Sequence, residues 1–271
     1  MSDPTLIDPA EVPVVILCGG MGTRIREASE KLPKPLIEIG GKPVLWHIMK
    51  TYSHFGFRRF VLCLGYKGDI IREFFLDYGL YDRDFTVKLG ADREVEWHGE
   101  RPTEDWDVTL AETGLETGTG GRIKKGARYL DQPHFLLTYG DGIGSVDIGA
   151  LYEQHVKSGL TGTVTGVHPT SRFGEMKVRG DAVHEFNEKP TMADGWVSGG
   201  YFVFNREMVD KYLTDEPGLM LEKHPLQSLA ADGGLGVFAH EGFWMGMDTF
   251  RDWSELNGLW DAGEAAWKVW D

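Results

Sequence analysis

The strongest constraint on the fold is the regular alternation of apolar runs and helix-like stretches in the first half of the chain. Residues 12–17, 59–64 and 134–138 are short runs of apolar, often β-branched side chains, which predicts buried strands. Residues 42–56 place apolar side chains at helical spacing, with Pro43 in the first turn and Gly56 as the stop. Further helices are expected at 69–78 and 122–129, and further strands at 87–89 and 107–111. Strands separated by helices favour a Rossmann-like α/β fold, with a mainly parallel (mixed) sheet flanked by helices.

The second half has a different pattern. Short alternating strands are expected at 161–167, 175–180, 182–189, 199–205 and 236–241, and helices near 206–213 and 223–231. No linker separates the halves, so we expect one domain with a core at 12–150, a smaller ligand-binding lobe at 151–248 and a helical tail at 249–271. Trp253, Trp260 and Trp267 in the tail have roughly helical spacing, which favours a core or subunit contact over a cofactor site.

Charge and cysteine content exclude several classes of protein. The chain has 28 Lys and Arg against 42 Asp and Glu, a formal net charge of −14, so neither nucleic acid nor an anionic membrane surface is an expected partner. No apolar stretch approaches the ~18 residues of a membrane helix. Cys18 and Cys63 both lie in apolar runs, and residues 1–13 lack the pattern of a signal peptide. A cytoplasmic protein is expected.

A glycine-rich loop directly after the first strand is the sharpest local motif. Glycines there allow the backbone N–H groups to approach a phosphate. The loop lacks the third glycine of a dinucleotide fingerprint, which disfavours a nicotinamide oxidoreductase, and it lacks the Gly-Lys-Ser/Thr ending of a Walker A loop. An ordinary strand-to-helix turn is the alternative. The loop consists of Leu17, Cys18, Gly19, Gly20, Met21, Gly22, Thr23 and Arg24.

Three charged residues are candidates for handling phosphate. Lys34 stands between Pro33 and Pro35, which hold it in an extended, low-entropy segment. Asp141 follows the strand at 134–138, where open α/β sheets bind ligands, and Asp248 lies in an apolar motif. Two carboxylates suit Mg²⁺, which takes one or two from a protein. The alternatives are a solvated lysine and turn or helix-cap aspartates.

Two further stretches are candidate binding segments. Residues 113–122 form a loop rich in hydroxyls and glycines that includes Thr117 and opens a helix near Arg122, a combination suited to an anion or a nucleotide. In the smaller lobe, Glu188-Lys189-Pro190 and Ser198-Gly199-Gly200 are suited to a polar ligand.

Taken in order, these motifs resemble a known family. GGMGTR, PKP, TYGDG, EKP, GGYFVFN and MDT are similar to motifs of the sugar-1-phosphate nucleotidyltransferases. WHIMK, TYGDG and FWMGMDTFRD further resemble the branch that transfers a cytidylyl group to glucose 1-phosphate. The resemblance covers about residues 12–271. Such enzymes usually carry Asn where this chain has Ser198, which leaves the identity of the sugar open, and the N-terminal extension of about ten residues has no counterpart role.

The resemblance implies a role for each candidate residue. Leu17 to Thr23, Thr117 and Gly140 would bind the nucleotide, and Asp141 and Asp248 would hold Mg²⁺. The catalytic cations would be Arg24, Lys34 and Arg122, and the sugar phosphate would be bound by Glu188, Lys189, Ser198 and Gly199.

The resemblance also implies the substrates and the reaction. The sugar phosphate would attack the α-phosphate of CTP, giving a CDP-sugar and pyrophosphate, in a homo-oligomer, trimer or hexamer. The alternatives are a thymidylyl- or uridylyltransferase, and a non-catalytic protein that binds nucleotide sugars.

Overall fold

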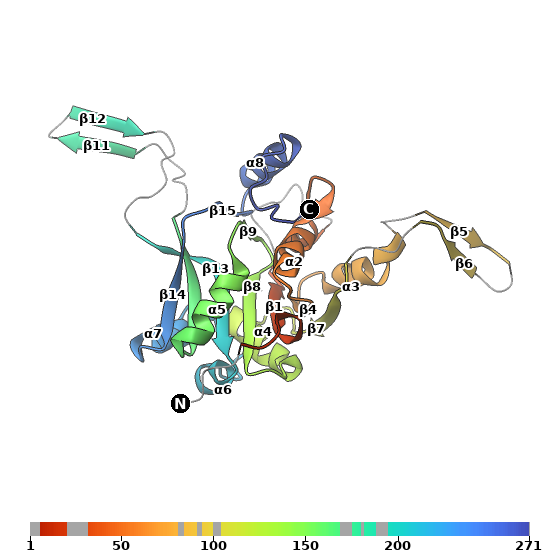
Figure 1. Cartoon of the computed structure of the whole chain (residues 1–271), viewed down its shortest axis with the longest axis horizontal. Helices are drawn as coiled ribbons and strands as arrows, with labels where there is room; N and C mark the ends of the chain where they lie inside the picture. The colour runs from red at the N-terminus through yellow and green to blue at the C-terminus, as the bar shows by residue number, and fades with distance from the viewer. Residues whose placement is uncertain are drawn as a thin grey trace.

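The structure is a computed structural model that describes residues 6–20, 32–80, 84–90, 94–99, 104–168, 175–179, 182–187 and 195–270. These residues form a central sheet of seven strands with helices on both faces (Figure 1). The strand order is β14-β10-β13-β8-β1-β4-β7. The strands are β1 (Pro13–Cys18), β4 (Arg59–Leu64), β7 (Asp107–Glu112), β8 (His134–Tyr139), β10 (Gly162–Val167), β13 (Val197–Asn205) and β14 (Leu235–His240).

One strand near the centre of the sheet runs opposite to the other six. Strand β1 runs parallel to β4 and β8, β4 runs parallel to β7, and β10 runs parallel to β14. Only β13 is antiparallel to its neighbours in this sheet, β8 and β10. The expectation of a mainly parallel, mixed sheet flanked by helices is therefore confirmed. Strands from both 12–150 and 151–248 enter this one sheet.

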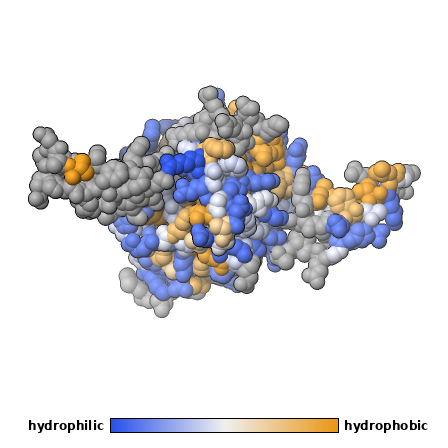
Figure 2. Space-filling view, turned by 90° about the horizontal axis from the view of Figure 1, so that it is seen from above, coloured by the Kyte–Doolittle hydropathy of each residue, from blue (hydrophilic) through white to orange (hydrophobic). Residues whose placement is uncertain are grey.

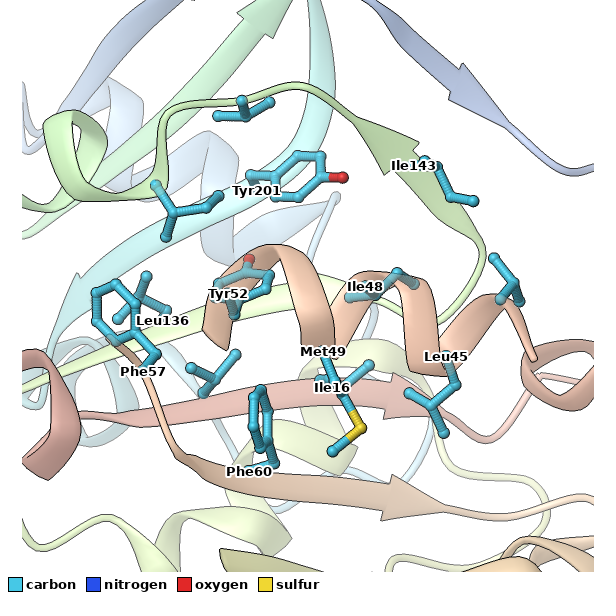
Figure 3. Close-up of a cluster of buried hydrophobic side chains, with 14 of the residues drawn as sticks. Ile16, Leu45, Ile48, Met49, Tyr52, Phe57, Phe60, Leu136, Ile143 and Tyr201 are labelled. Carbon is cyan, nitrogen blue, oxygen red and sulfur yellow. The ribbon is translucent and has the colours of Figure 1, made fainter. Parts of the chain in front are cut away.

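Two hydrophobic clusters lie on opposite faces of the sheet. Side chains alternate along β1, so that Val14 and Ile16 join one cluster, while Val15 and Leu17 join the other. Helices α2, α3, α5 and α8 contribute to the first cluster, and α4, α6 and α7 to the second. Figure 3 shows α2 lying along the strands with its apolar side chains directed toward Ile16 and Leu136. The helices are α2 (Val44–His54), α3 (Gly68–Leu76), α4 (Thr119–Gly126), α5 (Ile148–Ser158), α6 (Glu207–Tyr212), α7 (His224–Ala231) and α8 (Phe250–Asp261).

Short elements complete the described part of the chain. The two-stranded sheets are β2 (Glu38–Ile39) with β3 (Lys42–Pro43), β5 (Phe85–Lys88) with β6 (Glu94–Trp97), β9 (Gly142–Gly144) with β15 (Trp244–Gly246), and β11 (Glu175–Arg179) with β12 (Ala182–Asn187). The 3₁₀ turns are η1 (Pro9–Glu11), η2 (Lys34–Leu36), η3 (Tyr78–Leu80) and η4 (Ala127–Tyr129). The hairpins β5–β6 and β11–β12 project from opposite ends of the body (Figure 1).

Most predicted elements of the first half are confirmed. Strand β4 has the predicted bounds, and β1 begins and ends one residue later than predicted. Helix α2 begins at Val44 rather than residue 42, because Lys42 and Pro43 pair with β2. It ends as predicted, with Gly56 at φ 93° directly after the cap residue Phe55. Helix α4 starts at Thr119, three residues before the predicted start, so the glycine-rich stretch belongs to its first turn.

The helical tail predicted at 249–271 is helical only in its first part. Helix α8 ends at Asp261, and Trp267 lies beyond it in non-helical chain. Trp267 is fully buried in the first cluster, so this tryptophan serves the core as expected. The helix α5 was not predicted. Across the described ranges, no helix is long and apolar enough to cross a membrane.

Candidate active site

A cavity of about 370 Å³ opens where β1 and β8 end. The two strands are joined there by a bond from the Gly140 amide to the Leu17 carbonyl, at 3.1 Å. A Cβ atom at Gly140 would lie 3.0 Å from that carbonyl oxygen and 3.1 Å from the ring of Pro35. Glycine at 140 therefore allows the chain that carries Asp141 to pass close to the loop after β1.

This first pocket collects ten of the residues predicted from the sequence. They are Leu17, Cys18, Gly19, Gly20, Lys34, Thr117, Arg122, Gly140, Asp141 and Asp248. Its lining also includes Gly118 and Thr119, which belong to the predicted binding segment 113–122, and three residues that had been given no role, namely Pro35, Tyr139 and Met220. Tyr139 stands inside the TYGDG motif and was within reach of sequence reasoning, whereas nothing local marks Met220.

A second pocket, of about 130 Å³, adjoins the first. Because β13 runs antiparallel to β8, with Tyr201 opposite Thr138, the start of β13 faces the end of β8. This places the predicted sugar-binding residues Ser198 and Gly199 in the pocket wall. The Ser198 hydroxyl oxygen accepts a hydrogen bond from the amide of Gly200, at 3.3 Å.

The two pockets share one edge. Tyr139, Asp141 and Asp248 line both of them. Trp244 lines the second pocket, where its indole N–H donates to the Gly199 carbonyl at 2.7 Å. Sequence reasoning missed Trp244, although it lies in the same motif as Asp248. Two ligands that occupy the two pockets would meet at the carboxylate pair.

The small sheet β9–β15 brings the two carboxylates together. Its register pairs Gly246 with Gly142, and the Met247 amide continues the pairing with a bond to the Asp141 carbonyl at 2.9 Å. Asp141 therefore precedes one strand of this sheet, and Asp248 follows the other. Asp252 fixes the turn, because its carboxylate accepts hydrogen bonds from the Asp248 amide at 3.0 Å and from the next amide.

The ammonium of Lys34 lies between these carboxylates. Its Nζ is 2.6 Å from Asp141 Oδ2 and 2.8 Å from Asp248 Oδ1. Burial opposes the charge of the lysine, but the two carboxylates outweigh burial and raise the pKa of Lys34, so the side chain is a cation. The extended conformation predicted for Lys34 was wrong, because the residue starts the 3₁₀ turn η2, whose Ile37 amide bonds to the Lys34 carbonyl.

The same geometry suits a divalent ion. One cation already contacts both carboxylates, so their oxygens converge on a shared point. The side chains of Asp141 and Asp248 are 36% and 38% exposed, which leaves room for water and phosphate as further ligands. Within the described part of the chain, no cluster of three or more His, Cys, Asp or Glu has metal-binding geometry. Two convergent, partly exposed carboxylates fit Mg²⁺, because this ion takes only one or two carboxylates from a protein.

Arg122 is buried beneath the first pocket. Its Nη1 donates to the carbonyls of Leu64 at 2.9 Å and Gly114 at 2.8 Å, and Nη2 donates to the carbonyl of Gly19 at 3.0 Å. A Cβ atom at Gly19 would lie 2.1 Å from the guanidinium carbon, so this glycine makes room for the arginine. Arg122 thus ties the loop after β1 to the ends of β4 and β7, and its predicted role toward substrate phosphate stays a prediction.

The glycines of the TGTGGR motif pack against a distant part of the chain. The Gly118 amide donates to the Pro217 carbonyl at 2.6 Å, and the Gly121 amide donates to the Leu219 carbonyl at 3.2 Å. A Cβ atom at Gly118 would lie 2.4 Å from the Leu219 carbonyl oxygen. These two amides at the start of α4 are therefore bonded to the protein itself.

Six predicted site residues lie outside the residues that the structure describes, and their roles stay predictions. They are Met21, Gly22, Thr23, Arg24, Glu188 and Lys189.

Comparison with known proteins identifies the family. The nucleotidyl transferase model matches residues 13–257. The glucose-1-phosphate cytidylyltransferase of Salmonella typhimurium is 45% identical over 258 residues, which cover 95% of this chain and 99% of that protein. The Salmonella typhi protein of the same name matches with the same identity and coverage. The crystal structure of HddC from Yersinia pseudotuberculosis has the same fold, with a TM-score of 0.66, 23% identity and coverage of 92% of this chain and 99% of that one. Because the family match extends from β1 into α8, this chain belongs to the nucleotidyl transferase family.

Proposed function

We propose that this protein transfers the cytidylyl group of CTP to α-D-glucose 1-phosphate, giving CDP-glucose and pyrophosphate. The observation that carries the proposal is the shared edge of the two pockets, formed by Tyr139, Asp141 and Asp248. A transfer between two bound substrates needs neighbouring sites that meet at the reacting atoms. The 45% identity to two glucose-1-phosphate cytidylyltransferases supports the choice of CTP and glucose 1-phosphate.

The chemistry requires two anions to meet in an acidic protein. An oxygen of the sugar phosphate forms a bond to the α-phosphorus of CTP, and the bond from that phosphorus to the β-phosphate oxygen breaks, releasing pyrophosphate. No covalent intermediate on the protein is needed, so catalysis rests on positioning and on stabilising the developing charge. Lys34 supplies a fixed positive charge at the boundary of the two pockets.

The carboxylates have a complementary task. Asp141 and Asp248 would hold Mg²⁺, which when bound neutralises phosphate charge. Ser198 and Gly199 would contact the sugar from the start of β13. The roles of Arg24 toward the triphosphate, and of Glu188 and Lys189 toward the sugar phosphate, remain part of this proposal.

The direct test is pyrophosphate release from CTP, UTP, dTTP, ATP and GTP in the presence of glucose 1-phosphate and Mg²⁺, with reactions lacking the sugar phosphate as the control. We expect kcat/KM for CTP to exceed that for every other nucleotide by about tenfold or more. A preference for UTP or dTTP would assign the protein to the uridylyl- or thymidylyltransferases. Binding of CDP-glucose without pyrophosphate release from any nucleotide would indicate a non-catalytic homologue.

We further propose that the protein forms a homo-oligomer, a trimer or a hexamer. The β5–β6 hairpin pairs with no other strand among the described residues, and such a hairpin alone is marginally stable in water. It carries apolar side chains on its surface, among them Leu89 at 85% exposed and Val95 at 39% (Figure 2). Light scattering should give a trimeric or hexameric mass, and Leu89→Asp with Val95→Asp should lower it. An unchanged mass would exclude this hairpin as the contact.

We propose a cytoplasmic location as well. The two cysteines, Cys18 and Cys63, are both free and buried, which suits a reducing compartment. Cell fractionation of the producing organism tests this, and recovery of the protein outside the cytoplasmic fraction would contradict it.

A further inference from the structure

The first pocket has one wall that comes from far along the chain. Residues 216–222 lie against the start of α4 and contribute Met220 to the pocket. Two backbone bonds fix this segment, from Gly118 to the Pro217 carbonyl at 2.6 Å and from Gly121 to the Leu219 carbonyl at 3.2 Å. We call residues 216–222 the wall segment. Backbone hydrogen bonds join it to the start of α4.

Glu222 ends the wall segment and connects it to a second element. One of its carboxylate oxygens accepts a hydrogen bond from the Thr119 hydroxyl at 2.8 Å, and the other accepts one from the Tyr139 hydroxyl. The Thr119 oxygen in turn accepts from the Leu221 amide at 2.8 Å. A single carboxylate thus joins the first turn of α4, the wall segment and the end of β8.

Tyr139 is the residue whose position matters for two substrates. It is the last residue of β8, two positions before Asp141, and it lines both pockets. Its ring lies so close to Gly200, which has φ 79°, that a Cβ atom there would be 2.7 Å from a ring carbon. The ring is therefore confined by Gly200 on one side, and its hydroxyl is held by Glu222.

The hydrogen bond between Tyr139 and Glu222 has a defined donor and acceptor. The Tyr139 hydroxyl donates and the Glu222 carboxylate accepts. Hydrogen bonds to a charged acceptor are stronger than those between neutral groups. This hydrogen bond therefore holds the hydroxyl end of the Tyr139 ring in place.

Glu222 itself is exposed and does not line either pocket. Its effect on the reaction must pass through the residues it holds. We infer that Glu222 is a positioning residue, which keeps Tyr139 in place as the partition between the two pockets and so sets how the sugar phosphate meets the nucleotide. The inference rests on the proposed function.

The expected signature is a fall in turnover rather than in substrate binding. A partition that is free to move leaves both sites present but misaligns the reacting groups. For Glu222→Ala we expect kcat to fall about tenfold while each KM changes less than about threefold. For Glu222→Gln we expect kcat within about threefold of wild type, because the amide can accept from Tyr139 and donate to the Thr119 oxygen.

The test is a double-variant cycle on the purified full chain, with steady-state kinetics for CTP and glucose 1-phosphate. Tyr139→Phe should lower kcat as much as Glu222→Ala, and the combined variant should be no slower than either alone, to within about twofold. Lys223→Ala, an exposed neighbour outside the site, is the control and should match wild type. Circular dichroism and the melting temperature confirm folding of every variant. Should Glu222→Ala not fold, Glu222→Gln and Tyr139→Phe complete the comparison.

Several results would overturn the inference. A shared positioning role would be excluded if the fall in kcat of the combined variant equalled the product of the two single falls. It would also be excluded if Glu222→Ala left kcat unchanged or affected only KM. A crystal structure of Glu222→Ala with the Tyr139 ring unmoved between the pockets would overturn it without reference to activity. Wild-type turnover reports on the proposed function, whereas the ratios among variants report on Glu222, so the two failures are distinguishable.

Discussion

Acidification should destabilise this fold through a buried histidine. His47 in α2 is fully buried between Trp46 of the same helix and tryptophans of the C-terminal part. Its ring centroid lies 5.1 Å from that of Trp46 and 4.8 Å from that of Trp260. Its Nδ1 lies 3.4 Å from the Trp267 indole nitrogen, which only donates, so the ring proton is on Nε2 and bonds to the Ile39 carbonyl at 2.9 Å. Both nitrogens are therefore used by the neutral ring.

The size of the effect follows from the pKa. Burial lowers the pKa of His47 to about 4, against the backbone hydrogen bonds that raise it. In the unfolded chain the ring titrates near its usual pKa of about 6.5. Below that pH the unfolded state binds the extra proton, so stability is complete above pH 6.5 and is lost as the pH falls toward 4. Linkage gives a loss of about 2 kcal/mol in the free energy of unfolding between pH 7 and pH 5.

The assay is urea denaturation of the wild type and of His47→Gln at both pH values. Other titrating groups contribute equally in both proteins. The wild type and His47→Gln therefore differ in the free energy of unfolding lost between pH 7 and pH 5 only by the contribution of His47. We expect the wild type to lose about 2 kcal/mol more than His47→Gln. The control is His54→Gln, an exposed histidine of the same helix, which should keep the wild-type loss. If His47→Gln loses as much as wild type, to within about 0.5 kcal/mol, the linkage argument is wrong.

Three further predictions concern the active site. Asp141→Asn and Asp248→Asn should each nearly abolish pyrophosphate release while the circular dichroism spectrum is unchanged; wild-type activity of either variant at limiting Mg²⁺ would contradict the metal assignment. Lys34→Ala should slow the single-turnover rate by roughly 10²–10³, and a fall of less than about tenfold would reduce this residue to a binding role. Ser198→Asn should sharpen the preference for glucose 1-phosphate over its deoxy and epimeric analogues, measured as kcat/KM ratios; equal selectivity within about twofold would show that position 198 does not contact the sugar.

Local sequence patterns predicted the helices and strands that carry a clear apolar run or a clear stop signal. The apolar run at 59–64 is strand β4 without change, and the stop at Gly56 follows from its left-handed backbone. The strands β9 and β15 have only three residues each, two of them glycines in β9, so no periodicity marks them. Helix α5 was missed although Asp147 caps it, with its carboxylate accepting from the Ala150 amide.

The sequence identified individual residues of the site, but it did not predict which of them contact one another. Sequence motifs marked Lys34, Asp141 and Asp248 as charged groups for phosphate and metal, and the structure brings all three together. Their contact depends on the pairing of β9 with β15, which lie about a hundred residues apart. The same holds for the glycines of TGTGGR. Their close approach to the Leu219 carbonyl requires a segment that the sequence does not mark.

The order of the strands explains why the substrates would meet where they do. Strand β8 has β1 on one side, running parallel, and β13 on the other, running antiparallel. The loop after β1 forms the wall of the first pocket, and the start of β13 forms the wall of the second. Because a parallel strand ends and an antiparallel strand begins at the same edge, both walls flank the end of β8. Tyr139 and Asp141 stand at that end, so the reversed direction of β13 places the proposed partition and a proposed Mg²⁺ ligand between the two pockets.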